Sequence, residues 1–352
     1  MNFIEKRTVT LEKVLDEYCI ELEHSKKYSV CTKSTYVSVI KALKETELSN
    51  KLIKKITTED LQTLFDDLSS KYSKSRLLAY SAVLKHVFRY ACYPLRLIDS
   101  NPMEFVDIYS KVNERDIFEN QNKVNIISYT EYKQIIEYLD AKDSAFVLPI
   151  QISYYTGLRL GEVCALIWED IDFTNQCLLV QRSLAFNKLK RRYEFTLPKR
   201  KKIRYVEIPD VLKDILLEAR NKQDSLEKMY KNYYQVMTEN GIDSFVVNSC
   251  LKDECIEGKE IHPVCMQDNG MYINRRSLET CCLRIQKKLG LKSFHFHSLR
   301  HSYATNLLNH GATMNEVKEL LGHSDIGTTM NIYIHSSREK LKETVQCLND
   351  IL

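Results

Sequence analysis

Apolar residues recur at helical spacing through the first hundred positions of the chain. Each apolar run keeps one face of a helix hydrophobic and leaves the rest polar, which predicts amphipathic helices packed as a small bundle. Four such faces are formed by Leu11, Val14, Leu15, Tyr18 and Leu22; by Tyr36, Val39, Ile40 and Leu43; by Leu61, Leu64, Phe65 and Leu68; and by Leu77, Tyr80, Leu84, Val87, Phe88 and Ala91. Thr57 or Thr58 can cap the third helix, and the fourth ends before Pro94.

The pattern changes after this bundle. Residues 113–126 are mostly polar and lack periodicity, which indicates a linker. Ser128 and Glu131 then form a capping-box signature that begins a second, larger and mostly helical region. Residues 177–209 are the exception, because their β-favouring runs surround basic turns. Residues 244–247 are a further strand candidate, and residues 250–270 are predicted to be a loop or hairpin insertion.

Composition narrows the class of protein. The chain of 352 residues is 44% hydrophobic and 28% charged, values typical of a globular protein. We find no apolar run of the about 18 residues that a membrane-spanning helix needs, and the N-terminus has no apolar signal core. The 11 cysteines are odd in number and irregularly spaced, which suits free thiols in a reducing compartment. We therefore expect a soluble, cytoplasmic protein with no membrane partner.

Positive charge is concentrated in one segment. The net charge of the chain is only +4. Between Arg182 and Arg204, however, ten basic residues stand against the single acid Glu194. A local field of this strength is expected where a protein meets a polyanion, although a solvated charge run is the alternative.

Several separated segments carry residues suited to phosphate chemistry. His297 and Arg300 lie three apart on a predicted helix and therefore share a face. Gly322 is typical of a residue that ends a helix, here the helix beginning near Thr313. Three further candidates for phosphate chemistry lie before and after Gly322. These are Arg159 in Thr156-Gly157-Leu158-Arg159-Leu160-Gly161-Glu162, His323 directly after Gly322, and Tyr333.

The residue types fit attack on a phosphodiester. The planar guanidinium group of arginine can donate two parallel hydrogen bonds to the equatorial phosphate oxygens, on which negative charge accumulates during the attack. Arginine also stays protonated at any working pH. Histidine can exchange the proton of the nucleophile, because it titrates near neutrality. A lysine can protonate the departing alkoxide. A tyrosine needs nearby cations to become a phenolate, since its ordinary pKa is about 10.

The segments Thr156–Glu162, His297–Thr305 and Leu321–His335 resemble the signature boxes of the tyrosine recombinase family, the phage-type integrases. Residues 166–172, which read LIWEDID, and the helical region ending in Asn101-Pro102 extend the resemblance to most of the chain. It implies a mainly α fold with a small β-sheet or hairpin. The implied domains are a helical core DNA-binding domain at 1–112, a linker at 113–126, a catalytic tyrosine recombinase domain at 127–338 and a C-terminal helix for protomer contact at 339–352.

The resemblance also implies a role for each residue. Arg159 and Arg300 would clamp the scissile phosphate, His297 would act in acid–base work, and His323 would bond a non-bridging oxygen. Tyr333 would attack and leave a 3′-phosphotyrosyl link, while Glu162 would orient the neighbouring cations or form a plain helix ion pair. The family's general-acid lysine sits in a β-hairpin, where Lys199 matches best. This chain is one residue shorter there, so Lys201 and Lys202 remain alternatives.

Other basic residues are candidates for DNA contact. Lys33, Lys74 and Arg76 fall at predicted helix starts, where backbone N–H groups and the helix dipole favour phosphate, although ordinary capping explains the same positions. Arg200, Lys201 and Lys202 continue the basic segment.

The resulting hypothesis is a site-specific recombinase, the integrase of a mobile element, acting on double-stranded DNA. It needs no cofactor and no metal, because the phosphotyrosine link keeps the bond energy for rejoining. A homotetramer is expected in the synaptic complex, with room for an accessory DNA-bending or directionality factor. The apolar stripe of Leu341, Val345, Leu348 and Leu352 would dock on a neighbouring protomer or on its own domain. A Xer-like dimer resolvase is the close alternative. A topoisomerase-like enzyme and a non-catalytic DNA-binding protein with the same fold are the others.

Overall fold

The computed structural model describes residues 8–109, 126–199, 202–240, 245–251 and 259–322. The chain divides into two compact units, one made of residues 1–120 and 186–192 and one made of residues 121–185 and 193–352. Each is described by itself. Among the described helices, none is long and apolar enough to cross a membrane.

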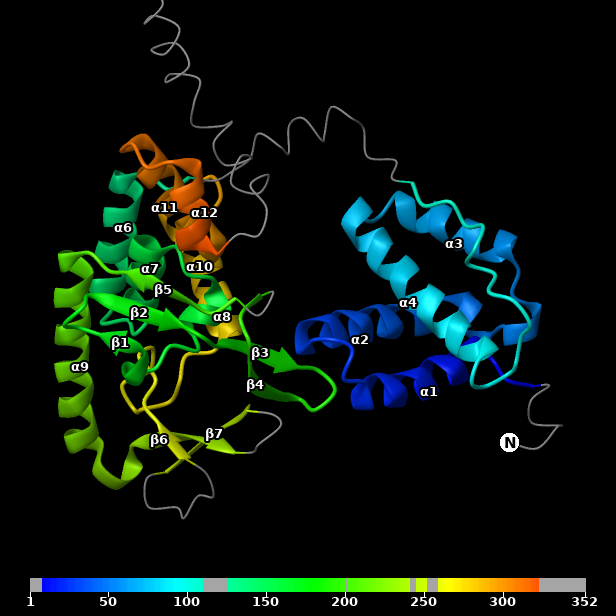
Figure 1. Ribbon diagram of the computed structural model, residues 1–352, viewed down its shortest axis with the longest axis horizontal. Helices are drawn as coiled ribbons and strands as arrows, with labels where there is room; N and C mark the ends of the chain where they lie inside the picture. Colours follow the sequence, from blue (N-terminus) through cyan, green and yellow to red (C-terminus); the bar gives the residue numbers. More distant parts are fainter. Residues whose placement is uncertain (1–7, 110–125, 200–201, 241–244, 252–258, 323–352) are drawn as a thin grey trace, which may run out of the picture. The chain divides into compact units, whose positions relative to one another are not determined.

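The first unit is a helical bundle (Figure 1). Its helices are α1 (Leu11–His24), α2 (Val30–Lys44), α3 (Thr58–Ser69) and α4 (Lys74–Cys92), with short 3₁₀ turns η2 (Glu47–Asn50) and η3 (Ile53–Lys55) after α2. The predicted apolar faces form its core, in which all of those residues are buried except the partly buried Leu64. Thr57 caps α3 and forms a reciprocal capping box with Asp60, so the predicted start of this helix is confirmed.

The second unit is also mainly helical. Its helices are α6 (Tyr129–Asp140), α7 (Val147–Thr156), α8 (Leu160–Val163), α9 (Asp210–Tyr230), α10 (Arg275–Leu289), α11 (Phe296–Asn309) and α12 (Met314–Leu321), with 3₁₀ turns η4 (Trp168–Asp170) and η6 (Lys231–Tyr233). The predicted capping box of Ser128 and Glu131 begins α6. Gly322 ends α12 in the left-handed conformation, with φ of 64°, as its position in the sequence predicts.

Two small sheets accompany these helices. The first has the antiparallel order β1-β2-β5, formed by β1 (Ile171–Asp172), β2 (Cys177–Val180) and β5 (Arg204–Glu207). The second has the order β3-β4-β7-β6-β8, formed by β3 (Ser183–Asn187), β4 (Arg192–Thr196), β6 (Gln235–Asn240), β7 (Phe245–Leu251) and β8 (Lys259–Ile261). Strands were predicted within residues 177–209 and 244–247, and both predictions are confirmed. The region 250–270 contains the strand β8.

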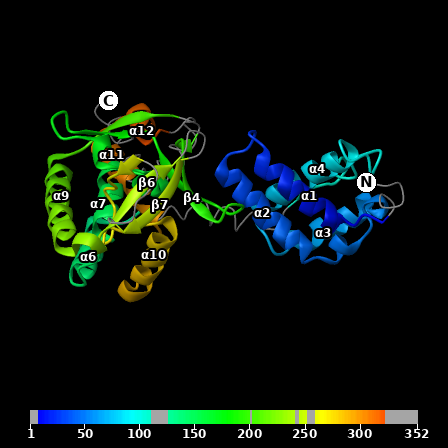
Figure 2. The same ribbon diagram turned by 90° about the horizontal axis from the view of Figure 1, so that it is seen from below.

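The helices that carry the site pack on one another in the second unit. α11 contacts α7, α7 contacts α9, and α12 contacts both α11 and β5. Figure 2 shows α7, α11 and α12 in the same part of this unit. Its core includes Ile150, Leu158, Val206 and Leu299, all fully buried. The described chain is therefore mostly helical with small sheets, which confirms the predicted fold class.

Candidate functional site

The first part of the site lies where α7 ends and α8 begins. Gly157 ends α7 with φ of 65°, a backbone conformation that favours glycine, and this turn brings Arg159 to the N-terminus of α8. The Glu162 carboxylate accepts a hydrogen bond from the backbone N–H of Arg159 at 3.0 Å. It also accepts one from the Arg159 guanidinium at 2.9 Å. Arg159 is thus held at both its backbone and its side chain by a residue one helical turn later.

Arg300 ties three helices together at this point. It projects from α11, is only 1% exposed, and donates hydrogen bonds to the backbone carbonyl oxygens of Gly157 and Leu321, each at 2.6 Å. These two carbonyls lie at the ends of α7 and α12, where helices leave carbonyl groups without an internal partner. The cation also opposes the negative ends of the two helix dipoles. The fold thereby brings Arg300 beside the turn that carries Arg159.

A third arginine, Arg204, belongs to the same cluster. It lies on β5, and its guanidinium makes a bidentate pair with Glu162 at 2.9 and 3.2 Å. Its Nε donates to the carbonyl oxygen of Leu320 at 3.1 Å. In the sequence, Arg204 is one member of the basic segment, and no role in the site was predicted for it. The available signal was the alternation of β5, in which Arg204 and Val206 share the buried face.

The cluster is mostly buried and carries excess positive charge. Arg159 and Arg204 pair with the single carboxylate of Glu162, which also acts electrostatically on the guanidinium of Arg300. Burial opposes ionisation of Glu162, but the hydrogen bonds and charge of Arg204, followed by those of Arg159, keep its pKa below the ordinary value. Burial, followed by the charge of Arg159, lowers the pKa of Arg300 to about 9, so it stays protonated at neutral pH.

Two histidines lie beside this cluster on α11. The rings of His297 and His301 meet edge to face, with their centroids 4.7 Å apart. His297 as a whole residue is exposed to solvent. The protein packed around it still removes part of its hydration, and this desolvation, followed by the charges of His301, Arg300 and Arg159, lowers its pKa to about 4. Burial and the charge of Arg300 lower the pKa of His301 to about 4 as well. Both imidazoles are therefore neutral at neutral pH and can accept a proton.

Lys199 lies between strands of two different sheets. The expectation was a lysine in a β-hairpin, but the adjacent strands β3 and β4 end their pairing before this residue. Lys199 is exposed and lies in the connection from β4 to β5, which passes from the five-stranded to the three-stranded sheet. Pro198 has no N–H to donate to a strand ladder, which explains why the strand does not continue. Lys202 is exposed in the same connection.

The predicted DNA-contacting residues of the first unit lie at helix starts, as expected. Lys74 begins α4 and is exposed. Arg76 lies within the first turn of α4 and stacks near the rings of Tyr72 and Tyr80, at 6.0 and 5.3 Å from their centroids. Lys33 lies in the first turn of α2, where its ammonium group donates to the carbonyl oxygen of Glu23 at 2.8 Å.

Other predicted residues lie outside the described part of the chain. These are Arg200, Lys201, His323, Tyr333 and the C-terminal segment 339–352. Of the predicted linker 113–126, only residue 126 is described. The last described residue is Gly322, which immediately precedes His323 and follows the two carbonyl groups that Arg204 and Arg300 bind.

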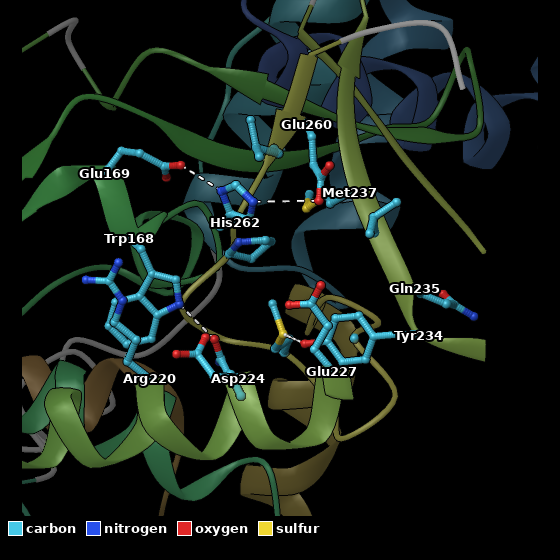
Figure 3. Close-up of a pocket in the computed structure, with 16 residues that line it drawn as sticks. Trp168, Glu169, Arg220, Asp224, Glu227, Tyr234, Gln235, Met237, Glu260 and His262 are labelled. Carbon is cyan, nitrogen blue, oxygen red and sulfur yellow. Dashed lines mark hydrogen bonds and ion pairs between the residues drawn. The ribbon is translucent and has the colours of Figure 1, made fainter. Parts of the chain in front are cut away.

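A separate cleft of about 340 Å³ lies between α9 and the strands β6 and β8 (Figure 3). The ring of His262 stands between Glu169 and Glu260, at 2.8 and 3.6 Å. Arg220 covers the Trp168 ring at 5.8 Å. The cleft is lined by four acids, Glu169, Asp224, Glu227 and Glu260. This excess of negative charge disfavours a phosphate, so the arginine cluster is the candidate site for phosphate chemistry.

Comparisons with known proteins agree with this choice of chemistry. Residues 125–340 match the model of the phage integrase family. A tyrosine recombinase XerC-like protein of Caldanaerobacter subterraneus subsp. tengcongensis is 30% identical over 318 residues, covering 88% of this chain and 75% of that protein. The integrase of Staphylococcus phage L54a is 24% identical, covering 99% of this chain and 95% of that protein.

Solved structures share the fold. The Tn1549 transposon integrase, in complex with transposon right end DNA, superposes with a TM-score of 0.67 at 19% identity, covering 97% of this chain and all of that one. A lambda integrase dimer bound to a core site gives a TM-score of 0.57 at 16% identity, covering 95% of this chain and 80% of that one.

The match to the family model and the identity to the XerC-like protein place the chain among enzymes that transfer DNA strands. The chain belongs to the phage integrase family, the tyrosine-type site-specific DNA recombinases.

Proposed function

We propose that this protein is the integrase of a mobile element and that Tyr333 is its nucleophile. The observation that carries the proposal is the excess of positive charge in the buried cluster of Arg159, Arg204, Arg300 and Glu162. A phosphodiester carries one negative charge and gains a second in the five-coordinate transition state. Fixed guanidinium groups stabilise that change in charge, and such preorganised electrostatic stabilisation is usually the largest catalytic contribution.

In the proposed step, the phenol oxygen of Tyr333 attacks phosphorus and the bond from phosphorus to the 5′ oxygen breaks. His297, which is neutral at neutral pH, accepts the phenol proton. Lys199 supplies a proton to the departing oxygen, so the products are a 3′-phosphotyrosyl link and a 5′-hydroxyl group. His323 would bond a non-bridging oxygen of the phosphate. The reverse reaction, with another 5′-hydroxyl, joins the exchanged strand and needs no additional energy source.

DNA is the proposed partner, and the neighbouring structures with DNA support this assignment. Phosphate contacts are assigned to Lys33, Lys74 and Arg76 in the first unit, and to the basic connection that includes Arg200, Lys201 and Lys202. Such contacts position a protein on the duplex without reading its sequence. The proposal further includes a homotetramer on two duplexes, in which segment 339–352 docks on a neighbouring protomer. It places the protein with DNA in the cytoplasm and allows an accessory DNA-bending or directionality factor.

Resolution of chromosome or plasmid dimers is the second candidate function. The observation in its favour is the 30% identity to the XerC-like tyrosine recombinase. Integration joins sites on separate molecules, whereas dimer resolution acts on two copies of one site within a circle. Two-plasmid and one-plasmid recombination assays, using direct repeats that flank the gene or a chromosomal dimer site, separate the two candidates.

Formation of the phosphotyrosyl link is tested with a nicked DNA duplex. The duplex carries one of the direct repeats that flank the gene. We expect a covalent protein–DNA complex with the wild type and none with Tyr333→Phe, which keeps the ring and removes the nucleophile. A complex of equal yield with the variant would overturn the assignment of Tyr333. Strand exchange between two such duplexes would exclude simple relaxation of DNA, and a failure to exchange would contradict recombination.

A further inference from the structure

We propose that Arg204 is a positioning residue of the strand-transfer site, an inference that rests on the function proposed above. Arg204 is 8% exposed as a whole residue, and its three nitrogen atoms are committed to Glu162 and to the carbonyl of Leu320. It therefore holds other site residues in place, whereas the side chain of Arg159 is the more exposed member of the cluster.

The first group that Arg204 positions is the pair of Arg159 and Glu162. Each oxygen of the Glu162 carboxylate accepts from Arg204, and the same two oxygens accept from the side chain and backbone of Arg159. A carboxylate gripped on both oxygens by a planar fork has one orientation. Arg159, whose side chain is 23% exposed, is the more accessible partner, so the rigid buried pair sets the direction in which it reaches.

The second group is the end of α12. The Nε of Arg204 binds the Leu320 carbonyl, while Arg300 binds that of Leu321. Gly322 lies directly against the Arg204 side chain. A Cβ atom at this position would come within 3.1 to 3.3 Å of its Cδ, Nε and Cζ atoms. Two guanidinium groups thus fix the last turn from which the chain continues into His323.

Arg204 also lies close in sequence to the proposed general acid. It begins β5, and residues 197–203, which include Lys199, lie between β4 and β5 in the sequence. One buried side chain therefore links the strand that follows Lys199, the pair that includes Arg159, and the helix end that precedes His323. Because these links are hydrogen bonds of fixed geometry, loss of the fork should impair alignment of the groups more than it impairs DNA binding.

The experiment compares Arg204→Gln and Arg204→Lys with wild type and with Arg284→Gln, the same loss of charge at an exposed position of α10. Single-turnover formation of the covalent complex is measured on the nicked duplex, together with DNA affinity. We expect the rate constant for Arg204→Gln to fall about 10- to 100-fold, by analogy with the loss of residues that orient metal ligands. DNA affinity should stay within about twofold of the wild-type value, and Arg284→Gln should react like wild type.

Arg204→Lys keeps the positive charge but loses the planar guanidinium group, so its rate constant should lie between those of Arg204→Gln and the wild type. A purely structural defect would instead reduce the fraction of protein that reacts, leaving the rate constant of the remaining fraction unchanged. A folded Arg204→Gln or Arg204→Lys variant that reacts at the wild-type rate would overturn the proposal for Arg204. If wild type and Tyr333→Phe form the complex equally, the function on which the proposal rests fails, whatever the Arg204 variants do.

Discussion

The guanidinium of Arg300 donates a hydrogen bond to the backbone carbonyl oxygen of Gly157, at 2.6 Å and across 143 positions of the chain. This contact joins two signature boxes that are far apart in the sequence. The carbonyl belongs to the turn that presents Arg159, so the position of one arginine depends on the backbone that carries the other. Charge alone does not create this arrangement, because two guanidinium groups repel each other. Carbonyl acceptors and Glu162 offset that repulsion.

Gly157→Ala should destabilise the protein and slow strand transfer. The left-handed backbone strains any side chain there, and a Cβ would lie 2.5 Å from Tyr303 Cδ1 and 2.7 Å from Leu321 Cδ2. We expect a loss of about 2–4 kcal/mol in the free energy of unfolding, which combines backbone strain and overpacking. Urea unfolding measures it.

Gly290→Ala is the matched control for Gly157→Ala. Its φ is also 65°, but no other atom lies within 4 Å of an added Cβ, so it measures the backbone cost alone, about 1–2 kcal/mol. Equal losses in the two variants would contradict the close packing of Gly157 against α11 and α12.

Arg159→Lys should lower cleavage while leaving DNA bound. Lysine keeps one positive charge but lacks the planar fork that can hold Glu162 and a phosphate oxygen together. Removing one such donor to the transition state costs about 10²–10³-fold in rate. Single-turnover cleavage of the nicked duplex measures the loss, with Arg220→Lys on α9 as the control substitution. Cleavage at the wild-type rate would contradict the proposed clamp.

Lys199→Ala should slow cleavage of ordinary DNA and spare a substrate with a better leaving group. A general acid contributes about 10²–10⁴-fold when the departing alkoxide needs its proton. A duplex with sulfur in place of the departing 5′ oxygen does not need it, because a thiolate leaves unprotonated. Cleavage of both duplexes is measured for Lys199→Ala, Lys201→Ala and Lys202→Ala. The general acid is the lysine whose alanine variant cleaves the ordinary duplex slowly and the sulfur duplex at the wild-type rate. If only the Lys201→Ala or the Lys202→Ala variant behaves in this way, Lys199 is excluded as the acid.

The stability of the protein should decline on mild acidification through His301. Its pKa is about 4 in the folded protein, mainly because of burial, against about 6.5 in the unfolded chain. Between these values the unfolded chain binds more protons, so stability is full above about pH 6.5 and falls as the pH decreases toward 4. His301→Gln removes this titration. We expect its urea midpoint to change less than that of wild type between about pH 7 and pH 5, and an equal change would contradict the low pKa.

Local features of the fold follow from local sequence. The face of Leu77, Leu84 and Phe88 predicts α4, because residues at this spacing share one side of a helix. The capping boxes at Thr57 and Ser128 start their helices as predicted, since the contacts that satisfy them lie within four residues. Gly322 ends α12 for the same reason.

The sheet arrangement was less accessible from sequence. The runs that contain β4 and β5 are visible in the sequence, but the strands with which they pair are not. The structure instead pairs β5 with β2 and places β4 between β3 and β7. Pairing of strands depends on distant partners, such as Leu178 opposite Val206, which no local pattern specifies. The position of Lys199 between two sheets was therefore not visible in the sequence, and its role as the general acid stays a prediction.

By itself, the sequence determined the helices, the separate boxes and the residue types suited to phosphate chemistry. Tertiary structure decided which of many arginines share one site. Arg204 looks like any other member of a basic segment until β5 turns it inward onto Glu162. The physical reason is that a buried guanidinium needs fixed acceptors around it, and only the folded chain brings the Glu162 carboxylate and the end of α12 to the same place.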